Sequence, residues 1–395
     1  MLQGTVHPDF WGVARVFARL IPRSGIGGAA VCVYHRGEPV VDLWAGTRDE
    51  ARNPWEADTV SLSYSTTKGV ATTLLHILAD RGLVDYDEPV AAYWPEFAQA
   101  GKDRITVRQL MSHQAGLYDI RGMIDDAHGM LDWDHMTGVL ARSVPAHEPG
   151  AAHAYHGLTY GWLVGELVRR LTGRSFPEAL EREIAEPLEL DGLYCGLPPS
   201  QMHRRARLVG PGLREGGALA RAKRVAKAIN RSFQLVRIPV DLRHAAAALL
   251  PAGMERVDFN SEELVRASIP AANGMFTARS LGKLYALLAN GGELGGIRLL
   301  SERTVRKANT IQSRRRDRVV PISMHWRLGY HRAPVGRSLP NAFGHAGFGG
   351  SGAWADPDRE LAVALVLNSG VGTPFGDLRI VRLSRAAIRA ADRRH

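Results

Sequence analysis

The sequence has few cysteines and lacks any long apolar run. Its 395 residues include two cysteines, Cys32 in an apolar strand-like run and Cys195 in a loop-like stretch, and neither has a neighbour at the spacing of a redox motif or a metal site. We therefore expect both thiols to be reduced and to serve packing. No stretch approaches the roughly 18 uninterrupted apolar residues of a membrane-spanning helix, and the first residues show no secretory leader. These absences predict a cytoplasmic protein that does not cross a membrane.

Signatures of several enzyme classes are also missing. The chain has 15 histidines but no H-E-x-x-H, and His153 and His156 form the only close pair, so no metal or other cofactor is expected. No G-x-S-x-G nucleophile elbow occurs. The G-x-G-x-x-A pattern of residues 25–30 precedes the first predicted strand instead of following it. We interpret this pattern as a turn into a strand.

Positive charge is in excess, with a formal net charge of +10. A nucleic-acid partner would leave a concentrated basic footprint, whereas the excess lies in three segments, residues 204–243, 314–316 and 379–394. No zinc-finger, RNA-recognition or helix-turn-helix pattern accompanies them, so no nucleic-acid partner is expected. We interpret the segments as solvated surface. The alternative is weak contact with an anionic membrane surface, because residues 221–229 could form a basic amphipathic helix.

Strand patterns lie at both ends of the sequence. Residues 28–37 and 38–46 predict an antiparallel hairpin, and a helical stretch around residues 10–20 precedes it. Near the other end, residues 352–355 and 361–367 predict a second hairpin across an Asp-Pro-Asp-Arg turn. A closing helix is predicted after it, over residues 377–394.

The middle of the sequence is mostly helical in its periodicity. The clearest helical stretches cover residues 70–78, 107–111, 160–171 and 277–288. This layout predicts an α/β (α+β) fold in which residues 1–80 and 290–395 form an antiparallel sheet flanked by helices. A mostly helical domain, residues 81–289, would be inserted into it, with a cleft where the two meet.

The main candidate for chemistry is the S-x-x-K motif formed by Ser65 and Lys68. On a helix the two side chains lie on one face, one turn apart. Burial lowers the pKa of an ammonium group, so an uncharged Lys68 could take the hydroxyl proton of Ser65. The same spacing occurs at Ser280 and Lys283, which we place inside a long amphipathic helix. Ser65 instead follows a β-rich run and starts a helix, where free N–H groups favour an oxyanion.

Three blocks of the sequence together resemble a known family. They are the S-x-x-K motif, the tripeptide Tyr155-His156-Gly157, and residues 344–351, which read Gly-His-Ala-Gly-Phe-Gly-Gly-Ser. Residues 110–117 and 272–274 add to the likeness. The order and spread of these blocks resemble serine β-lactamases and penicillin-binding proteins, and most of all the family VIII carboxylesterases, which share the class C β-lactamase fold.

The resemblance implies roles for individual residues. Tyr155 would stand beside Ser65 and Lys68 and share the transferred proton; whether Tyr155 or Lys68 is the formal base stays open, because coupled groups titrate as a unit. The segment His345, Ala346 and Gly347 would bind substrate where β-lactamases carry Lys-Thr-Gly. The backbone N–H of Phe348 would join that of Ser65 in the oxyanion hole.

Two departures from the β-lactamase pattern bear on the substrate. His345 replaces a lysine, and Tyr155-His156-Gly157 lacks the asparagine of Y-x-N. Both changes disfavour β-lactam and peptide substrates. We therefore expect a carboxylesterase that cleaves short to medium chain esters, small molecules, through an acyl-enzyme on Ser65. The alternatives are a β-lactamase or D-alanyl-D-alanine peptidase, and a catalytically silent scaffold or binding protein of the same fold. The oligomeric state is left open.

Overall fold

The computed structural model describes residues 2–21, 25–209, 242–320, 322–335, 339–369 and 378–394. Its strands are β1 (Gln3–Val6), β2 (Gly28–His35), β3 (Glu38–Gly46), β4 (Ser61–Leu62), β5 (Leu193–Cys195), β6 (Gly274–Phe276), β7 (Glu293–Leu294), β8 (Ile297–Arg298), β9 (His331–Arg332), β10 (Phe343–Ala346), β11 (Gly352–Asp356) and β12 (Leu361–Leu367). Its α-helices are α1 (Trp11–Leu20), α2 (Thr66–Asp80), α3 (Val107–Met111), α4 (Ile120–Met123), α5 (Trp133–Arg142), α6 (Thr159–Thr172), α7 (Phe176–Leu180), α9 (Leu242–Leu249), α10 (Glu262–Arg266), α11 (Ala278–Ala289), α12 (Glu302–Ala308) and α13 (Leu378–Ala391).

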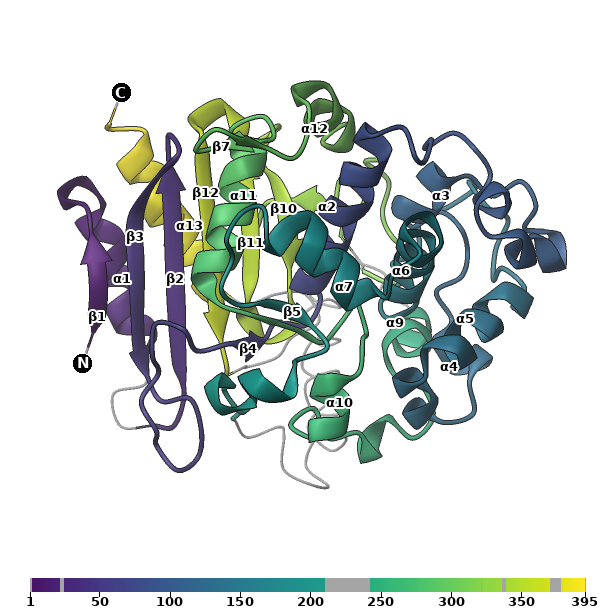
Figure 1. Cartoon of the computed structure of the whole chain (residues 1–395), viewed down its shortest axis with the longest axis horizontal. Coiled ribbons are helices and arrows are strands. Elements are labelled where there is room, and N and C mark those ends of the chain that lie inside the picture. The colour runs from purple at the N-terminus through teal and green to yellow at the C-terminus, as the bar shows by residue number, and fades with distance from the viewer. Residues whose placement is uncertain are drawn as a thin grey trace.

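Both ends of the chain build one antiparallel sheet. Its strand order is β1-β3-β2-β12-β11-β10-β9, and every neighbouring pair is antiparallel. The pairing of β12 with β2, in which Leu361 lies opposite His35, joins the C-terminal hairpin to the N-terminal one. Figure 1 shows α11 on one face of this sheet and α1 with α13 on the other. The predicted fold class, including both hairpins and the closing helix, is therefore confirmed.

The two faces of the sheet bury side chains of different size. On β2, Val31 and Val33 point to the α1 and α13 face, while Ala30 and Cys32 point to the α11 face. This alternation follows from the two-residue period of a strand. Small side chains let α11 approach closely, and a Cβ atom added to Gly282 of α11 would lie 2.9 Å from the sulfur of Cys32. Cys32 is thus a buried free thiol used in packing, as predicted.

The helical part lies beside the sheet, with α3 to α6 and α9 grouped to the right in Figure 1. Helix α2 runs along the junction and contacts both α6 and β10. The helices expected over residues 70–78, 107–111 and 160–171 are α2, α3 and α6. Helix α11 falls inside the predicted range 81–289, yet it packs on β2, β11 and β12 and belongs to the sheet layer. The division of the chain into two domains stays a prediction.

A small second sheet, with the order β4-β6-β5, supports the start of α2. Ser61 and Leu62 of β4 pair with Phe276 and Met275 of β6. Cys195, predicted to lie in a loop, is instead the last residue of β5 and a buried free thiol. The prediction was wrong because three-residue strands are too short to show a two-residue period.

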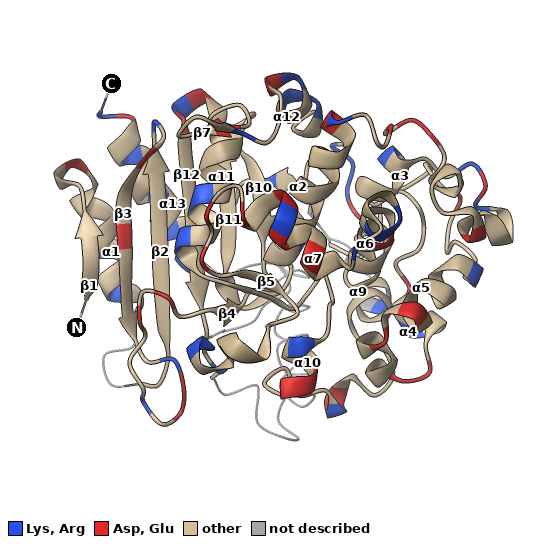
Figure 2. Cartoon of the chain, viewed as in Figure 1, with Lys and Arg blue, Asp and Glu red and all other residues tan. Residues whose placement is uncertain are grey.

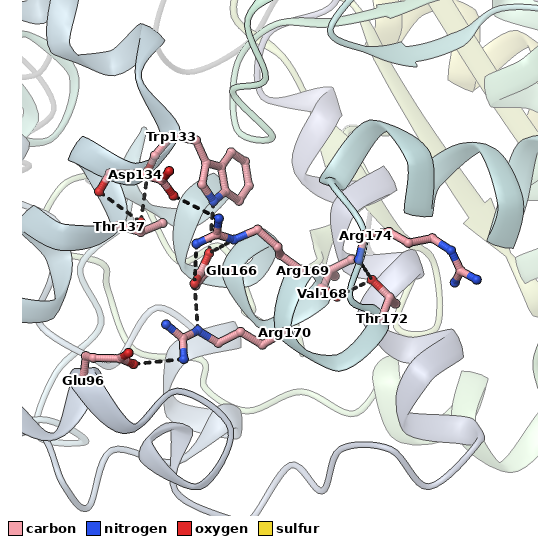
Figure 3. Close-up of polar contacts among 10 residues, drawn as sticks. All are labelled: Glu96, Trp133, Asp134, Thr137, Glu166, Val168, Arg169, Arg170, Thr172 and Arg174. Atoms are coloured by element: carbon pink, nitrogen blue, oxygen red, sulfur yellow. Dashed lines mark hydrogen bonds and ion pairs between the residues drawn. The ribbon is translucent and has the colours of Figure 1, made fainter.

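Helix α6 is fixed to its surroundings by a buried carboxylate, shown in Figure 3. Glu166 accepts hydrogen bonds from Arg169 Nε (2.7 Å), Arg170 Nε (2.7 Å) and Trp133 Nε1 (3.0 Å). Arg170 also pairs with Glu96 at 2.9 Å. Burial alone would raise the pKa of Glu166, but the hydrogen bonds from Arg169, Trp133 and Arg170 outweigh burial and lower it. Glu166 therefore stays charged and ties α6 to α5.

The basic segments differ in their surroundings. Arg204 is buried and pairs with Asp58 and Asp191, so its assignment to a solvated surface is wrong. Residues 314–316 are exposed, and residues 221–229 lie outside the described residues. Figure 2 shows basic and acidic residues interspersed along the elements. Within the part of the chain that the structure describes, no helix has the length and apolar character needed to cross a bilayer.

Candidate active site

A sharp turn between β4 and α2 presents Ser65. Tyr64 has a φ of +46°, in the left-handed region that non-glycine residues seldom adopt. The Tyr64 ring contacts the rings of Phe259 and Phe348, at centroid distances of 5.4 and 5.3 Å. Ser65 then occupies the N-cap position of α2, as predicted, and its side chain makes no capping hydrogen bond. The hydroxyl is therefore left to interact with the side chains around it.

The second S-x-x-K sequence has a different environment. Ser280 lies in the first turn of α11 and not in mid-helix, because the helix begins at Ala278 and is capped by Thr277. The Ser280 hydroxyl is buried, and its recorded side-chain partner is Thr277 Oγ1 at 2.9 Å. Ser280 is thus part of a helix cap, whereas the Ser65 hydroxyl contacts its motif lysine.

Lys68 is fully buried and surrounded by neutral acceptors. Its Nζ lies 3.0 Å from Ser65 Oγ, 2.7 Å from the carbonyl oxygen of Gly157 and 2.9 Å from that of Ala271. Burial lowers the pKa of Lys68 well below its ordinary value, because a buried ammonium loses its hydration. The arrangement suits an uncharged amine that gives its two hydrogens to the carbonyls and directs its lone pair to Ser65.

Tyr155 reaches the same hydroxyl from the helical part of the chain. Its phenol donates a hydrogen bond of 2.8 Å to Ser65 Oγ, and Lys68 Nζ lies 4.9 Å from the centre of its ring. Burial raises the pKa of the phenol; the hydrogen bond to Ser65 opposes this in part, and the negative charge of Asp317 adds to the increase. The structure thus brings the predicted side chains of Lys68 and Tyr155 within hydrogen-bonding distance of Ser65 Oγ.

Strand β10 carries the predicted oxyanion and substrate segment to the Ser65 turn. A Cβ atom added to Gly347 would lie 2.3 Å from the carbonyl oxygen of Ser63 and 2.8 Å from Thr66 Oγ1, so only glycine fits here. The glycine is needed for this internal packing and not only for the approach of a substrate. No hydrogen-bond partner is recorded among the described residues for the backbone N–H of Ser65 or of Phe348. Both groups remain candidates for an oxyanion hole.

His345 is more enclosed than its predicted role implies. It is 2% exposed, and its ring lies 4.6 Å from that of His331. Burial lowers the pKa of His345 well below its ordinary value, and the nearby His331 and Lys68 add to the effect. Ala346 is half-buried, and its N–H donates to His331 Nε2 at 3.0 Å. Substrate binding by His345, Ala346 and Gly347 stays a prediction, and burial favours the neutral form of the His345 imidazole.

Several residues that shape the site were not predicted. The carbonyl of Ala271 reaches Lys68 because the buried side chain of Asn273 fastens the preceding turn, donating to the carbonyls of Leu264 and Ala267. The 272–274 stretch of the resemblance was the available signal. Asp317, Trp326 and His113 also contact Tyr155: Asp317 accepts a hydrogen bond from its backbone N–H, and the rings of Trp326 and His113 lie against its ring.

The histidines of the site are engaged with the backbone. His153 Nδ1 lies 2.9 Å from the carbonyl oxygen of Ser112, and His156 Nε2 accepts from the N–H of Leu117 at 3.0 Å. Across the described ranges, no group of three or more histidine, cysteine or acidic side chains is arranged to hold a metal ion.

Known proteins resemble this chain in sequence over most of its length. The family model for beta-lactamase matches residues 13–387. The chain belongs to the beta-lactamase family. It is 41% identical over 374 residues to the esterase/beta-lactamase LipL of Mycobacterium tuberculosis, a match that covers 92% of this chain and 82% of LipL.

Two solved structures extend the likeness over the whole fold. A penicillin-binding protein homologue from Caulobacter crescentus has a TM-score of 0.85 and 36% identity, covering 99% of this chain and 100% of its own. A family VIII carboxylesterase has a TM-score of 0.86 and 36% identity with the same coverage. The resemblance predicted from the three sequence blocks is therefore confirmed.

Proposed function

We propose that this member of the beta-lactamase family is a carboxylesterase that cleaves short to medium chain esters through an acyl-enzyme on Ser65. One observation carries the proposal: Ser65 Oγ has Lys68 Nζ at 3.0 Å and the Tyr155 hydroxyl at 2.8 Å. The similarity to a relative named as an esterase and to a family VIII carboxylesterase supports the same reaction class.

In the proposed acylation, Lys68 acts as the base. Burial favours its uncharged form, and its two N–H groups donate hydrogen bonds to the carbonyls of Gly157 and Ala271. The proton of the Ser65 hydroxyl passes to the amine as Oγ bonds to the ester carbonyl carbon. The resulting oxyanion would be held by the N–H of Ser65 at the start of α2 and by the N–H of Phe348 after β10, and each such donor typically contributes about 3 kcal/mol.

Collapse of this intermediate requires a proton donor. The bond from carbon to the alcohol oxygen breaks, and the alcohol takes a proton from the Tyr155 phenol. The protonated Lys68 then gives its extra proton to Tyr155. The raised pKa of Tyr155 keeps this donor protonated beforehand. Water then attacks the acyl carbon, the bond to Ser65 Oγ breaks, and the proton of the water returns to Ser65 through Tyr155 and Lys68. The acid is released and the site is restored.

The surroundings of Ser65 favour neutral and apolar substrates. His345 is neutral, so it supplies no permanent cation to hold the carboxylate of a β-lactam or a peptide. Gly157 offers no side-chain amide. Phe348 is exposed and packs edge to face on Tyr64, which places apolar surface beside the nucleophile. These features suit an acyl chain better than a charged group.

The test is hydrolysis of activated acetate and butyrate esters by Ser65→Ala. We expect kcat to fall by at least about a thousandfold, since members of one catalytic unit fail together. Ser280→Ala, the change at the second S-x-x-K sequence, is the matched control and should retain wild-type activity. Mass spectrometry of protein quenched during turnover should find the acyl group on Ser65. Near wild-type turnover by Ser65→Ala would end the proposal.

The same protein preparation separates the β-lactamase alternative. A panel of cephalosporins and a peptide ending in D-alanyl-D-alanine should be turned over far more slowly than butyrate esters. Faster turnover of either would reassign the substrate class while leaving Ser65 as the nucleophile.

A further inference from the structure

A buried carboxylate lies behind Tyr155 and is bonded by N–H groups. Asp317 is 5% exposed. Its Oδ1 accepts from the backbone N–H of Tyr155 (3.0 Å), Val319 (2.7 Å) and Val320 (2.9 Å), and its Oδ2 accepts from Trp326 Nε1 at 2.8 Å. No ion pair of Asp317 is recorded among the residues that the structure describes. Four N–H donors therefore take the place of a cationic partner.

The bonds of Asp317 join two separate parts of the site. The Trp326 ring stacks on the Tyr155 ring, with centroids 5.4 Å apart and an interplanar angle of 9°. The ring of His113 contacts both of them, at 5.1 Å from Tyr155 and 4.3 Å from Trp326. Asp317 thus holds the backbone of Tyr155 with one oxygen, and with the other it holds the indole that lies flat on the phenol ring.

A carboxylate that only shapes its own loop has a different pattern of bonds. Asp49, for example, accepts from the backbone and side chain of Asn53, four residues away on an exposed turn. Asp317 bonds to Tyr155, which lies 162 positions earlier in the chain, and to Trp326, whose ring touches the same residue. Two of its four bonds therefore act on the phenol that contacts Ser65.

We propose that Asp317 is a positioning residue for Tyr155, which it holds through the Tyr155 backbone N–H and the stacked indole of Trp326 so that the phenol stays on Ser65 Oγ. This inference rests on the proposed function for its ester readout. No hydrogen bond joins Asp317 to Ser65 or Lys68 in the described structure, so its effect passes through Tyr155. A displacement of about 1 Å in a catalytic group can cost on the order of 100-fold in rate.

The test compares Asp317→Asn in two backgrounds. The asparagine keeps the size of the side chain but turns an N–H donor toward the indole N–H of Trp326. In the wild-type background we expect kcat, and the rate at which a fluorophosphonate labels Ser65, each to fall on the order of 100-fold, with KM changed less than about threefold. In the Tyr155→Phe background, Asp317→Asn should cost less than about a further threefold, because the hydroxyl that it positions is already absent.

The controls separate positioning from general stability. Asp356→Asn alters another buried carboxylate, which lies at the end of β11 and pairs with Arg359, and it should leave both rates unchanged in folded protein. Trp326→Leu removes the stacked ring while Asp317 remains, and it should show the same dependence on Tyr155. This variant carries the test if Asp317→Asn does not fold.

The outcomes distinguish this inference from the proposed function. Fluorophosphonate labelling reports the activation of Ser65 whether or not esters are the substrate, so failure of ester turnover in the wild type leaves the labelling comparison intact. Equal losses from Asp317→Asn with and without the phenol hydroxyl of Tyr155 would overturn the positioning role. A loss matched by Asp356→Asn would do the same.

Discussion

Lys68 and Glu166 are buried ionisable groups on two helices, α2 and α6, that pack against each other, and they are treated in opposite ways. Glu166 is paired with the guanidinium groups of Arg169 and Arg170, and its pKa is lowered, so it stays charged. Lys68 is bonded to a hydroxyl and two carbonyls, and its pKa is also lowered, which favours its uncharged form. The fold supplies counter-ions to Glu166, whose charge holds two helices together, and withholds them from Lys68, the proposed base.

The largest expected effect comes from Lys68→Met, which removes the amine but keeps a long side chain. Activity on butyrate esters should fall about a thousandfold or more, because the base of the proposed reaction is gone. The free energy of unfolding should change by less than about 1 kcal/mol, since relief of the desolvated amine offsets the lost hydrogen bonds to Ser65 and to the carbonyls of Gly157 and Ala271. Urea unfolding beside the ester assay checks both. Less than a tenfold loss of activity would contradict the assignment of Lys68.

Glu166→Gln should give the reverse pattern. The substitution leaves Arg169 and Arg170 without their shared carboxylate, and we expect a loss of about 2–3 kcal/mol of stability, less than for a fully enclosed pair because both guanidinium groups are partly exposed. Ester turnover by the folded variant should stay within about twofold of wild type. Urea unfolding and assays well below the melting temperature measure the two quantities. Lost turnover with unchanged stability would show that Glu166 acts in the reaction and is not a structural residue in contrast to Lys68.

The two groups should also affect stability in different pH ranges. The folded pKa of Glu166 lies below its ordinary value of 4.5, so its stabilisation is present above pH 4.5 and is lost as the pH falls through the folded pKa. The folded pKa of Lys68 lies below its ordinary value of 10.5. Between the folded pKa of Lys68 and pH 10.5, the unfolded chain binds more protons than the folded protein, so the free energy of unfolding rises with pH up to about 10.5. Glu166→Gln should flatten only the acid side of a plot of unfolding free energy against pH, and Lys68→Met only the rise between the folded pKa of Lys68 and about pH 10.5. Equal changes on both sides would refute the assignment of these shifts.

Much of the fold could be predicted from local pattern. In the two hairpins and in the apolar stripe after Ser65, the strand or helix periodicity extends over enough residues to predict the element. Ser65 and Lys68 lie within one helical turn, so their proximity could also be predicted. Tyr155 was predicted only through the resemblance, because a single aromatic residue carries no spacing signal. Asp317 follows a run of arginines and bonds to a residue 162 positions away, which no local pattern indicates. The carbonyl of Ala271 was equally hidden, since every residue has one.

The smallest expected effect supplies a matched control for Glu166. Glu302 and Arg306 on α12 form an ion pair with the same i,i+4 spacing as Glu166 and Arg170, at 2.8 Å against 2.7 Å, but both side chains are exposed. Water and salt screen the exposed pair, so Glu302→Gln should cost less than about 0.5 kcal/mol, and less still in about 1 M salt. Urea unfolding at low and high salt makes the comparison. A cost near that of Glu166→Gln would mean that pairing geometry, and not burial, sets the strength of these contacts, and the contrast with Lys68 would then lose its physical basis.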